Sequence, residues 1–198
     1  MLNRRTLVAG VTALGVSLIG ALALGGLPAG ASMKAVLASP SKGLLATAQA
    51  SRLGFTKVVG KPTTTTKTGV TGCGKGAEVA FEDSTGATGL ISEILVCKSA
   101  SGPAGLLKKA KKAGSTSSAA MPPKQLGSTA IELAAQGTTY AIYWQRGTVL
   151  EVVALDTNVP ASASSTTTTS APGPVIPLTS QQQQTLSNAA LAQDAAVK

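Results

Sequence analysis

The chain has no histidine, few aromatic residues and little negative charge. Its 198 residues include 3% Phe, Trp and Tyr, and 8 Asp and Glu against 17 Lys and Arg. The lack of histidine removes the usual general base, the serine and cysteine protease arrangements and the commonest metal ligand. Catalysis would have to rest on carboxylates or lysines. The formal net charge of +9 favours attraction to anionic partners but does not bear on the fold.

The first 31 residues have the features of a secretory signal peptide. Two adjacent arginines precede an uncharged apolar stretch over residues 7–27, and Ala29 and Ala31 occupy the small-residue positions of a cleavage site. The apolar stretch is also long enough to span a bilayer, so an uncleaved N-terminal anchor is the alternative. Both interpretations place the rest of the chain outside the cytoplasmic membrane, either secreted or in the cell envelope.

Cys73 and Cys97 are the only cysteines of the chain. An even number of cysteines in an exported chain favours a disulfide over a metal or redox site. A three-residue hairpin loop over residues 84–86, with Gly86 in the left-handed conformation, would place Cys73 opposite Cys97. The predicted hairpin and the predicted disulfide therefore support each other.

The pattern of apolar residues predicts an α+β fold with helices packed on an antiparallel sheet. Residues 61–76, rich in Thr and Gly, are expected to form a loop. Helices are expected over residues 42–53, 103–113 and about 180–197, and strands over 55–59, 77–81, 90–97, 130–135, 139–145 and 148–155. A helix followed by three strands thus occurs twice, which we interpret as a possible internal duplication.

We expect a single α+β domain over residues 32–160, a Ser/Thr/Pro-rich linker over 161–177 and a C-terminal helix over 178–198. The register of the last hairpin stays open. A two-residue or a three-residue loop at Arg146-Gly147 would set Trp144 opposite Val149 or Thr148, respectively.

Two partial motif matches fail on inspection. Residues 69–75 fit the first seven positions of a phosphate-binding loop, but Gly76 stands where Ser or Thr must hold Mg²⁺. Residues 39–42 and 67–69 fit the S-x-x-K and K-T-G elements of penicillin-recognising serine enzymes, whose S-D-N element is absent. We therefore expect no cofactor, no metal ligands and no catalytic residues.

A carboxylate pair is the one catalytic arrangement that the composition leaves open. Glu78, Glu82 and Asp83 lie together near the first hairpin, and Glu132 and Glu151 could share a sheet face. A cell-envelope hydrolase that uses such a pair is therefore the alternative to a non-enzymatic protein.

Candidate binding residues are basic. Lys108, Lys109, Lys111 and Lys112 cover the outer face of the expected helix over 103–113, and Arg146 lies in the last hairpin. These side chains are candidates for contact with an anionic polymer or headgroup.

Three aromatic residues lie close together in the sequence, at Tyr140, Tyr143 and Trp144. Alternate strand positions separate Tyr143 from the other two. We expect at least one of these faces to be core, while the other is a possible partner surface.

Residues 140–149 form an expected strand, an Arg-Gly turn and a second strand, and a helix rich in Ala and Gln follows further along. This arrangement resembles the end of many uncharacterised secreted or lipoprotein-like actinobacterial envelope domains, over roughly a third of the chain. The resemblance implies an envelope location more than an activity. The lipid-anchor cysteine of the lipoprotein members is missing here.

The sequence thus predicts an exported, non-enzymatic protein that binds an anionic envelope polymer or a partner protein. A structural or assembly role through the C-terminal helix is a further alternative. Membrane contact is expected only through an uncleaved N-terminal segment, and no specific nucleic-acid binding is expected.

Overall fold

The computed structural model describes residues 33–66, 68, 70–113, 122–135, 139–157 and 177–197. The expected signal peptide over 1–31 and most of the expected linker over 161–177 lie outside the described residues. The described part confirms the α+β class, because its strands form an antiparallel sheet with helices packed against it.

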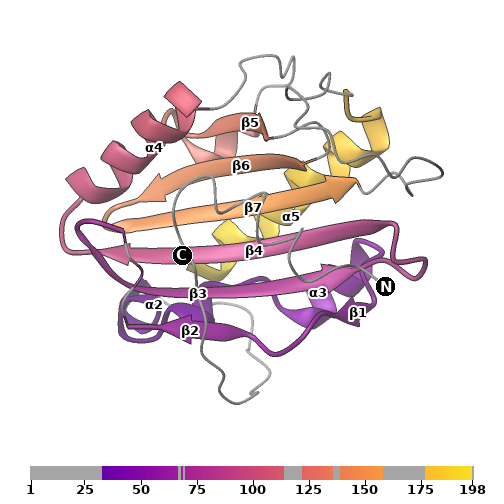
Figure 1. Ribbon diagram of the computed structural model, residues 1–198, viewed down its shortest axis with the longest axis horizontal. Helices are drawn as coiled ribbons and strands as arrows, with labels where there is room; N and C mark the ends of the chain where they lie inside the picture. Colours follow the sequence, from indigo (N-terminus) through magenta and orange to yellow (C-terminus); the bar gives the residue numbers. More distant parts are fainter. Residues whose placement is uncertain are drawn as a thin grey trace, which may run out of the picture.

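The sheet has seven strands, and every pair is antiparallel. They are β1 (Lys57–Val58), β2 (Thr63–Thr65), β3 (Cys73–Glu82), β4 (Thr88–Cys97), β5 (Ile131–Ala135), β6 (Thr139–Arg146) and β7 (Val149–Thr157). Their order is β1-β3-β4-β7-β6-β5, with the short β2 also paired to β3 (Figure 1). β4 and β7 lie at the centre, which explains why almost every residue of both strands is buried.

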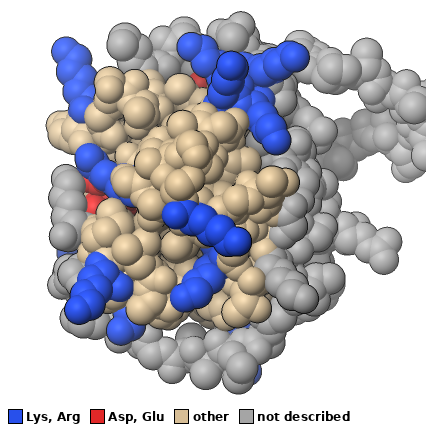
Figure 2. Space-filling view, turned by 90° about the vertical axis from the view of Figure 1, so that its left-hand side faces the viewer, with Lys and Arg blue, Asp and Glu red and all other residues tan. Residues whose placement is uncertain are grey.

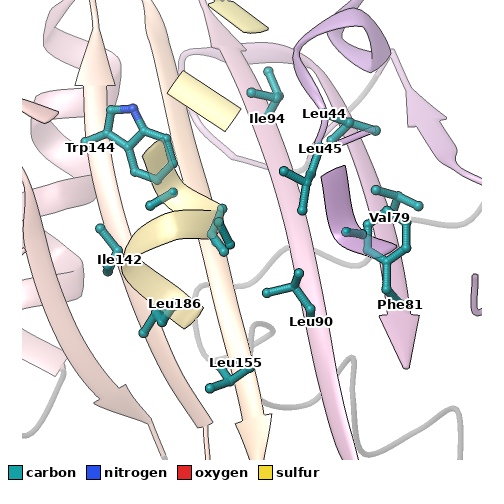
Figure 3. Close-up of a cluster of buried hydrophobic side chains, with 14 of the residues drawn as sticks. Leu44, Leu45, Val79, Phe81, Leu90, Ile94, Ile142, Trp144, Leu155 and Leu186 are labelled. Atoms are coloured by element: carbon teal, nitrogen blue, oxygen red, sulfur yellow. The ribbon is translucent and has the colours of Figure 1, made fainter. Parts of the chain in front are cut away.

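Helices cover both faces of this sheet. They are α2 (Met33–Ala38), α3 (Thr47–Arg52), α4 (Ser101–Ala113) and α5 (Ser180–Val197), with 3-10 turns η1 (Pro40–Gly43) and η2 (Lys124–Leu126). α5 and the N-terminal helices lie behind the sheet in Figure 1, and Leu186 of α5 joins Trp144 and Ile142 of β6 in the larger core (Figure 3). α4 covers the other face with Leu106 and Leu107, which belong to a second core cluster.

The C-terminal helix begins where the sequence predicts. The Gln182 amide N–H donates to Thr179 Oγ1 at 3.2 Å, and the Thr179 amide N–H donates to Gln182 Oε1 at 2.9 Å. This reciprocal cap satisfies amides that the helix itself leaves without partners. Leu186, Ala189 and Ala190 are then buried against the sheet, so the apolar side of α5 is part of the core of this domain.

The order of the strands is consistent with the expected internal duplication, but the placement of the helices is not. β1, β3 and β4 run from one edge to the centre, and β5, β6 and β7 do the same from the other edge. The helices break this symmetry, because α2 and α3 contribute to the larger core whereas α4 contributes to the core on the opposite face.

The first expected helix is wrong over much of its length. Residues 42–53 form the end of η1 and then α3, with Leu44 extended between them at ψ 153°. Leu45 donates its amide N–H to Ser92 Oγ at 2.9 Å, and both leucines are buried. Contacts with the sheet therefore override the local helical pattern.

The expected loop over 61–76 is also partly wrong, because β2 and the first four residues of β3 lie inside it, and β2 pairs with residues 76–78 of β3. Thr and Gly residues give this stretch no alternation of apolar and polar positions, so its strands leave no periodic signal.

The register of the first hairpin differs by one residue from the expected one. The expected three-residue loop would pair Glu78 with Ser92, but Glu78 pairs with Glu93 instead. A register shift between Cys73 and Lys75 then brings Cys73 opposite Cys97. The two cysteines form the predicted disulfide.

The last hairpin follows neither expected register. Arg146 pairs with Val149, so Trp144 lies opposite Glu151. Gly147 has φ 56°, a left-handed conformation suited to the first position of a two-residue turn, and Arg146 therefore stays in the strand.

Candidate functional site

The acidic residues of the protein lie mostly in its interior, and the described basic residues lie on its surface. All eight Asp and Glu lie within the described residues, and none of them is fully exposed. Six are buried, namely Glu82, Glu93, Glu132, Glu151, Asp156 and Asp194, and the other two, Glu78 and Asp83, are half-buried. Of the 13 described Lys and Arg residues, 12 are exposed and only Arg146 is not. The accessible charge is therefore almost entirely positive.

Four of the exposed cations lie on α4. Lys108, Lys109, Lys111 and Lys112 are all exposed, while Ala110 between them is 3% exposed and packs on the sheet. No carboxylate lies within ion-pair distance of these four ammonium groups, since the ion pairs among the described residues involve Lys57 and Arg146. The helical spacing thus brings the expected quartet to one outward surface.

A second group of cations lies at the end of the sheet that carries the disulfide, here called the disulfide end. Lys75 Nζ lies 3.5 Å from the carbonyl of Leu37 in α2, the helix that also carries Lys34, and the Lys98 amide donates to the Gly72 carbonyl at 2.8 Å. α4 begins three residues after Lys98. Figure 2 faces this end and shows Lys and Arg side chains around it with only small acidic areas.

Arg146 does not join the lysines. Its Nε donates to Asp194 Oδ1 at 2.7 Å and its Nη2 donates to the Gln125 carbonyl at 3.1 Å. The hydrogen bond to Asp194 raises the pKa of Arg146. The guanidinium therefore holds α5 to the sheet, and its charge is paired with Asp194, so the expected contact with an anionic ligand stays a prediction for this residue.

A buried polar network continues from this ion pair beneath α5. Gln193 is fully buried, and its amide donates to the Glu93 carbonyl at 3.1 Å and its Oε1 accepts from Ser92 Oγ at 2.6 Å. Burial and the nearby Asp194 raise the pKa of Glu151 to about 8, although Arg146 opposes this shift. Neither carboxyl oxygen of Glu151 has a hydrogen-bond partner of ordinary length. The neutral acid is therefore the favoured form of Glu151 at neutral pH.

The three aromatic side chains do not form a partner surface. Tyr140, Tyr143 and Trp144 are 3%, 5% and 0% exposed, with Tyr143 on the α4 side of the sheet and the other two in the larger core. Both faces of β6 are covered by helices, so the expected surface does not exist in this structure. All three residues serve as core.

Three of the carboxylates expected to pair are held apart or bound by other side chains. Glu82 is bound by Lys57 at 2.7 Å, and Glu132 accepts a hydrogen bond from Gln183 at 2.7 Å. Glu132 and Glu151 do share the face beneath α5, but β6 lies between their strands, which sets their Cα atoms about 10 Å or more apart. Each carboxylate instead has a local structural environment.

One pair of carboxyl groups that the sequence did not predict lies side by side on β3 and β4. Glu78 and Glu93 are direct partners in the register of β3 and β4. Burial raises the pKa of Glu93 to about 8, with a further contribution from Glu78, and burial raises the pKa of Glu78 as well. Tyr143 lies on the same face, and its pKa is raised by burial and by Glu93. The one-residue register error is what concealed this pair.

Comparisons of this chain with protein-family models, with curated proteins and with solved structures find no match. Within the part of the chain that the structure describes, no helix is long and apolar enough to cross a membrane. The disulfide fits an oxidising compartment.

Proposed function

We propose that this protein binds an anionic polymer of the cell envelope and acts outside the cytoplasmic membrane by binding rather than by catalysis. The observation that carries the proposal is the separation of charge, with carboxylates buried or half-buried and nearly all cations exposed. The ligand chemistry is a chain of repeating phosphodiester or carboxylate groups, because exposed cations spread over several elements match repeated negative charges.

The lysines of α4 supply the most concentrated part of this surface. Lys108 and Lys112 are four residues apart on one helix, and Lys108 and Lys111 are three apart. Each such pair of like charges destabilises a helix by about 0.2–0.5 kcal/mol. A polyanion that bridges these ammonium groups would remove the repulsion, so binding and helix stability act in the same direction.

The disulfide end extends the surface beyond one helix. Lys34, Lys75 and Lys98 come from three separate segments that the disulfide and the α2 contact hold together. A binding surface built on rigid elements loses little conformational entropy when a polymer binds. The main-chain positions of these lysines are therefore ready for contact, although their side chains stay mobile in solvent.

Two separate features support the envelope location. The N-terminal 31 residues have the pattern of an export signal, and the two cysteines are bonded. Anionic wall polymers are the abundant polyanions on that side of the membrane, which favours them as the ligand over nucleic acid.

The test compares two triple variants with the same change in net charge. In one variant Lys108, Lys109 and Lys112 of α4 are changed to Gln, and in the matched control Arg52, Lys61 and Lys124 are changed to Gln. Binding to poly(glycerol phosphate) is measured by isothermal titration at about 50 mM salt, with neutral dextran as the ligand control. We expect the α4 variant to lose about tenfold in affinity and the control less than about threefold.

Equal losses in the two variants would show that only net charge matters and would contradict a defined site. Binding to dextran as tight as binding to the polyanion would contradict the electrostatic mechanism. Turnover of a wall polymer that is abolished by Glu93→Gln in a folded variant would overturn the non-enzymatic proposal in favour of a carboxylate-pair hydrolase.

A further inference from the structure

A cavity of about 300 Å³ opens at the end of the sheet opposite the disulfide end. Four separate segments line it, namely the turn after α3, the β3–β4 hairpin, the end of β7 and the first turns of α5. Among the described residues, no lysine or arginine lines this cavity. The lysine surface and the cavity therefore offer different chemistry.

The inner part of the cavity is apolar. Leu53, Phe55 and Leu155 contribute to it, and Phe55 and Leu155 are only 4% and 1% exposed. These side chains are also part of, or packed against, the larger core, so their positions do not depend on a ligand. Leu53 is half-buried, so it is the part of this wall that the C–H groups of a ligand can contact.

Uncharged polar groups surround this wall. The hydroxyls of Thr88 and Thr185 and the amide of Gln181 line the cavity, and none of these three side chains makes a hydrogen bond within the described part of the chain. Thr179 and Gln182 also line the cavity, but their mutual cap already fixes them in place. Hydroxyl and amide groups both donate and accept, which suits a ligand whose own groups do the same.

Asp83 limits the net charge of a ligand that this cavity can bind. Its Oδ1 accepts from the Thr85 amide, the Thr85 hydroxyl and the Ala87 amide, at 2.8–3.1 Å. Burial alone would raise the pKa of Asp83, but these hydrogen bonds and one involving Gly86 lower it below the ordinary value. An ionised carboxylate in a cavity without a cation repels anionic groups and accepts hydrogen bonds from hydroxyls.

We infer that this cavity binds a single neutral sugar unit, with C–H groups of the ring toward Leu53 and its hydroxyls toward Thr88, Gln181, Thr185 and Asp83. The volume is at the lower end of the range for small-molecule sites, which limits the occupant to about one ring. The inference does not depend on the lysine surface, so each site is tested without the other.

The experiment is an NMR titration of the folded, oxidised protein with glucose, galactose, N-acetylglucosamine and, as the charged comparison, glucuronate. We expect saturable binding of at least one neutral sugar with a dissociation constant of about 1 mM, and amide shifts confined to the cavity residues. Thr185→Val keeps the side-chain shape and removes the hydroxyl, and it should weaken binding about fivefold. Gln184→Ala, an exposed position of α5 outside the cavity, is the matched control and should leave the affinity unchanged.

Three results would overturn the inference. They are the absence of saturation by any neutral sugar up to about 50 mM, shifts that lie outside the cavity, and tighter binding of glucuronate than of the neutral sugars. Equal affinity of wild type and Thr185→Val would also count against it, because the proposed hydrogen bond would then not exist.

Discussion

α4 contains two glycines in opposite surroundings. A Cβ atom added at Gly102 would lie 2.8 Å from Cys97 Cβ and 3.1 Å from its Sγ, whereas one added at Gly105 would meet nothing within 4 Å. Gly102 therefore allows the first turn of α4 to pack directly on the disulfide. Gly105 has no comparable role and only loosens the helix.

These distances predict opposite effects of the same substitution. Carbon atoms ordinarily approach to about 3.5 Å, so Gly102→Ala must move α4 or Cys97 by about 0.7 Å. Overpacking of this kind costs about 1–3 kcal/mol, and the better helix propensity of alanine returns up to about 1 kcal/mol. We expect Gly102→Ala to lower the free energy of unfolding by about 1–2 kcal/mol and Gly105→Ala to raise it by about 0.5–1 kcal/mol.

The assay is urea denaturation of the oxidised wild type and the two variants, followed by far-ultraviolet circular dichroism. The change is a single methyl group in both cases, so differences in the unfolded state largely cancel. If Gly102→Ala proved as stable as Gly105→Ala, the packing of α4 on the disulfide would be refuted.

Three other predictions follow from the interior. Because burial raises the pKa of Glu93 and Glu151 to about 8, the folded state retains protons that the unfolded state releases above the ordinary value of 4.5. The free energy of unfolding should therefore fall as pH rises from about 5 to about 8 and then level off, and Glu151→Gln should weaken this pH dependence. Urea denaturation across this pH range checks the prediction, and a free energy of unfolding that rises with pH would contradict it. Reduction of the disulfide, whose cysteines are 24 residues apart, should cost about 3.5 kcal/mol in the same assay, and no change would show that the bond does not constrain the chain. Arg146→Ala should cost about 3 kcal/mol, because Asp194 is 1% exposed and would lose the guanidinium 2.7 Å away. A loss below about 1 kcal/mol would mean that the ion pair is effectively solvated.

The strands with clear alternation or a continuous apolar run could be predicted from the sequence. The alternating residues 77–81 and the apolar run over 90–97 lie within β3 and β4, and the cysteine pair in a chain expected to be exported predicted the disulfide. Short-range patterns suffice for such elements because each strand has its own buried face. The α4 lysines were also predictable, since helical spacing alone places them on one side of an amphipathic helix.

Strand register could not be predicted, and this concealed the pairing of Glu78 with Glu93. One position separates the expected partner of Glu78 from the observed one, Glu93, and nothing local distinguishes the two loops. The irregularity next to Cys73 compensated for the same error, so the disulfide was predicted despite a shifted ladder.

The role of Arg146 was concealed for a different reason. Its partner Asp194 lies 48 residues away on a helix beyond the expected linker, and no sequence pattern connects the two. The burial of the acidic residues does have a signal in the sequence, because six of the eight carboxylates fall inside strands of the sheet. Residues inside the strands of a sheet that is covered on both faces are buried. Acidic residues at these positions therefore predict a surface with a larger excess of positive charge than the composition of the whole chain suggests.

The most direct test of the central claim is the salt dependence of binding to poly(glycerol phosphate). If several exposed lysines contact the polymer together, the logarithm of the binding constant should fall linearly with the logarithm of salt concentration, with a slope of about −3 or steeper. The measurement uses the wild-type protein at constant pH between about 50 and 300 mM salt. An affinity that does not change with salt over this range would contradict the proposal that the outward positive charge of this protein is its binding surface.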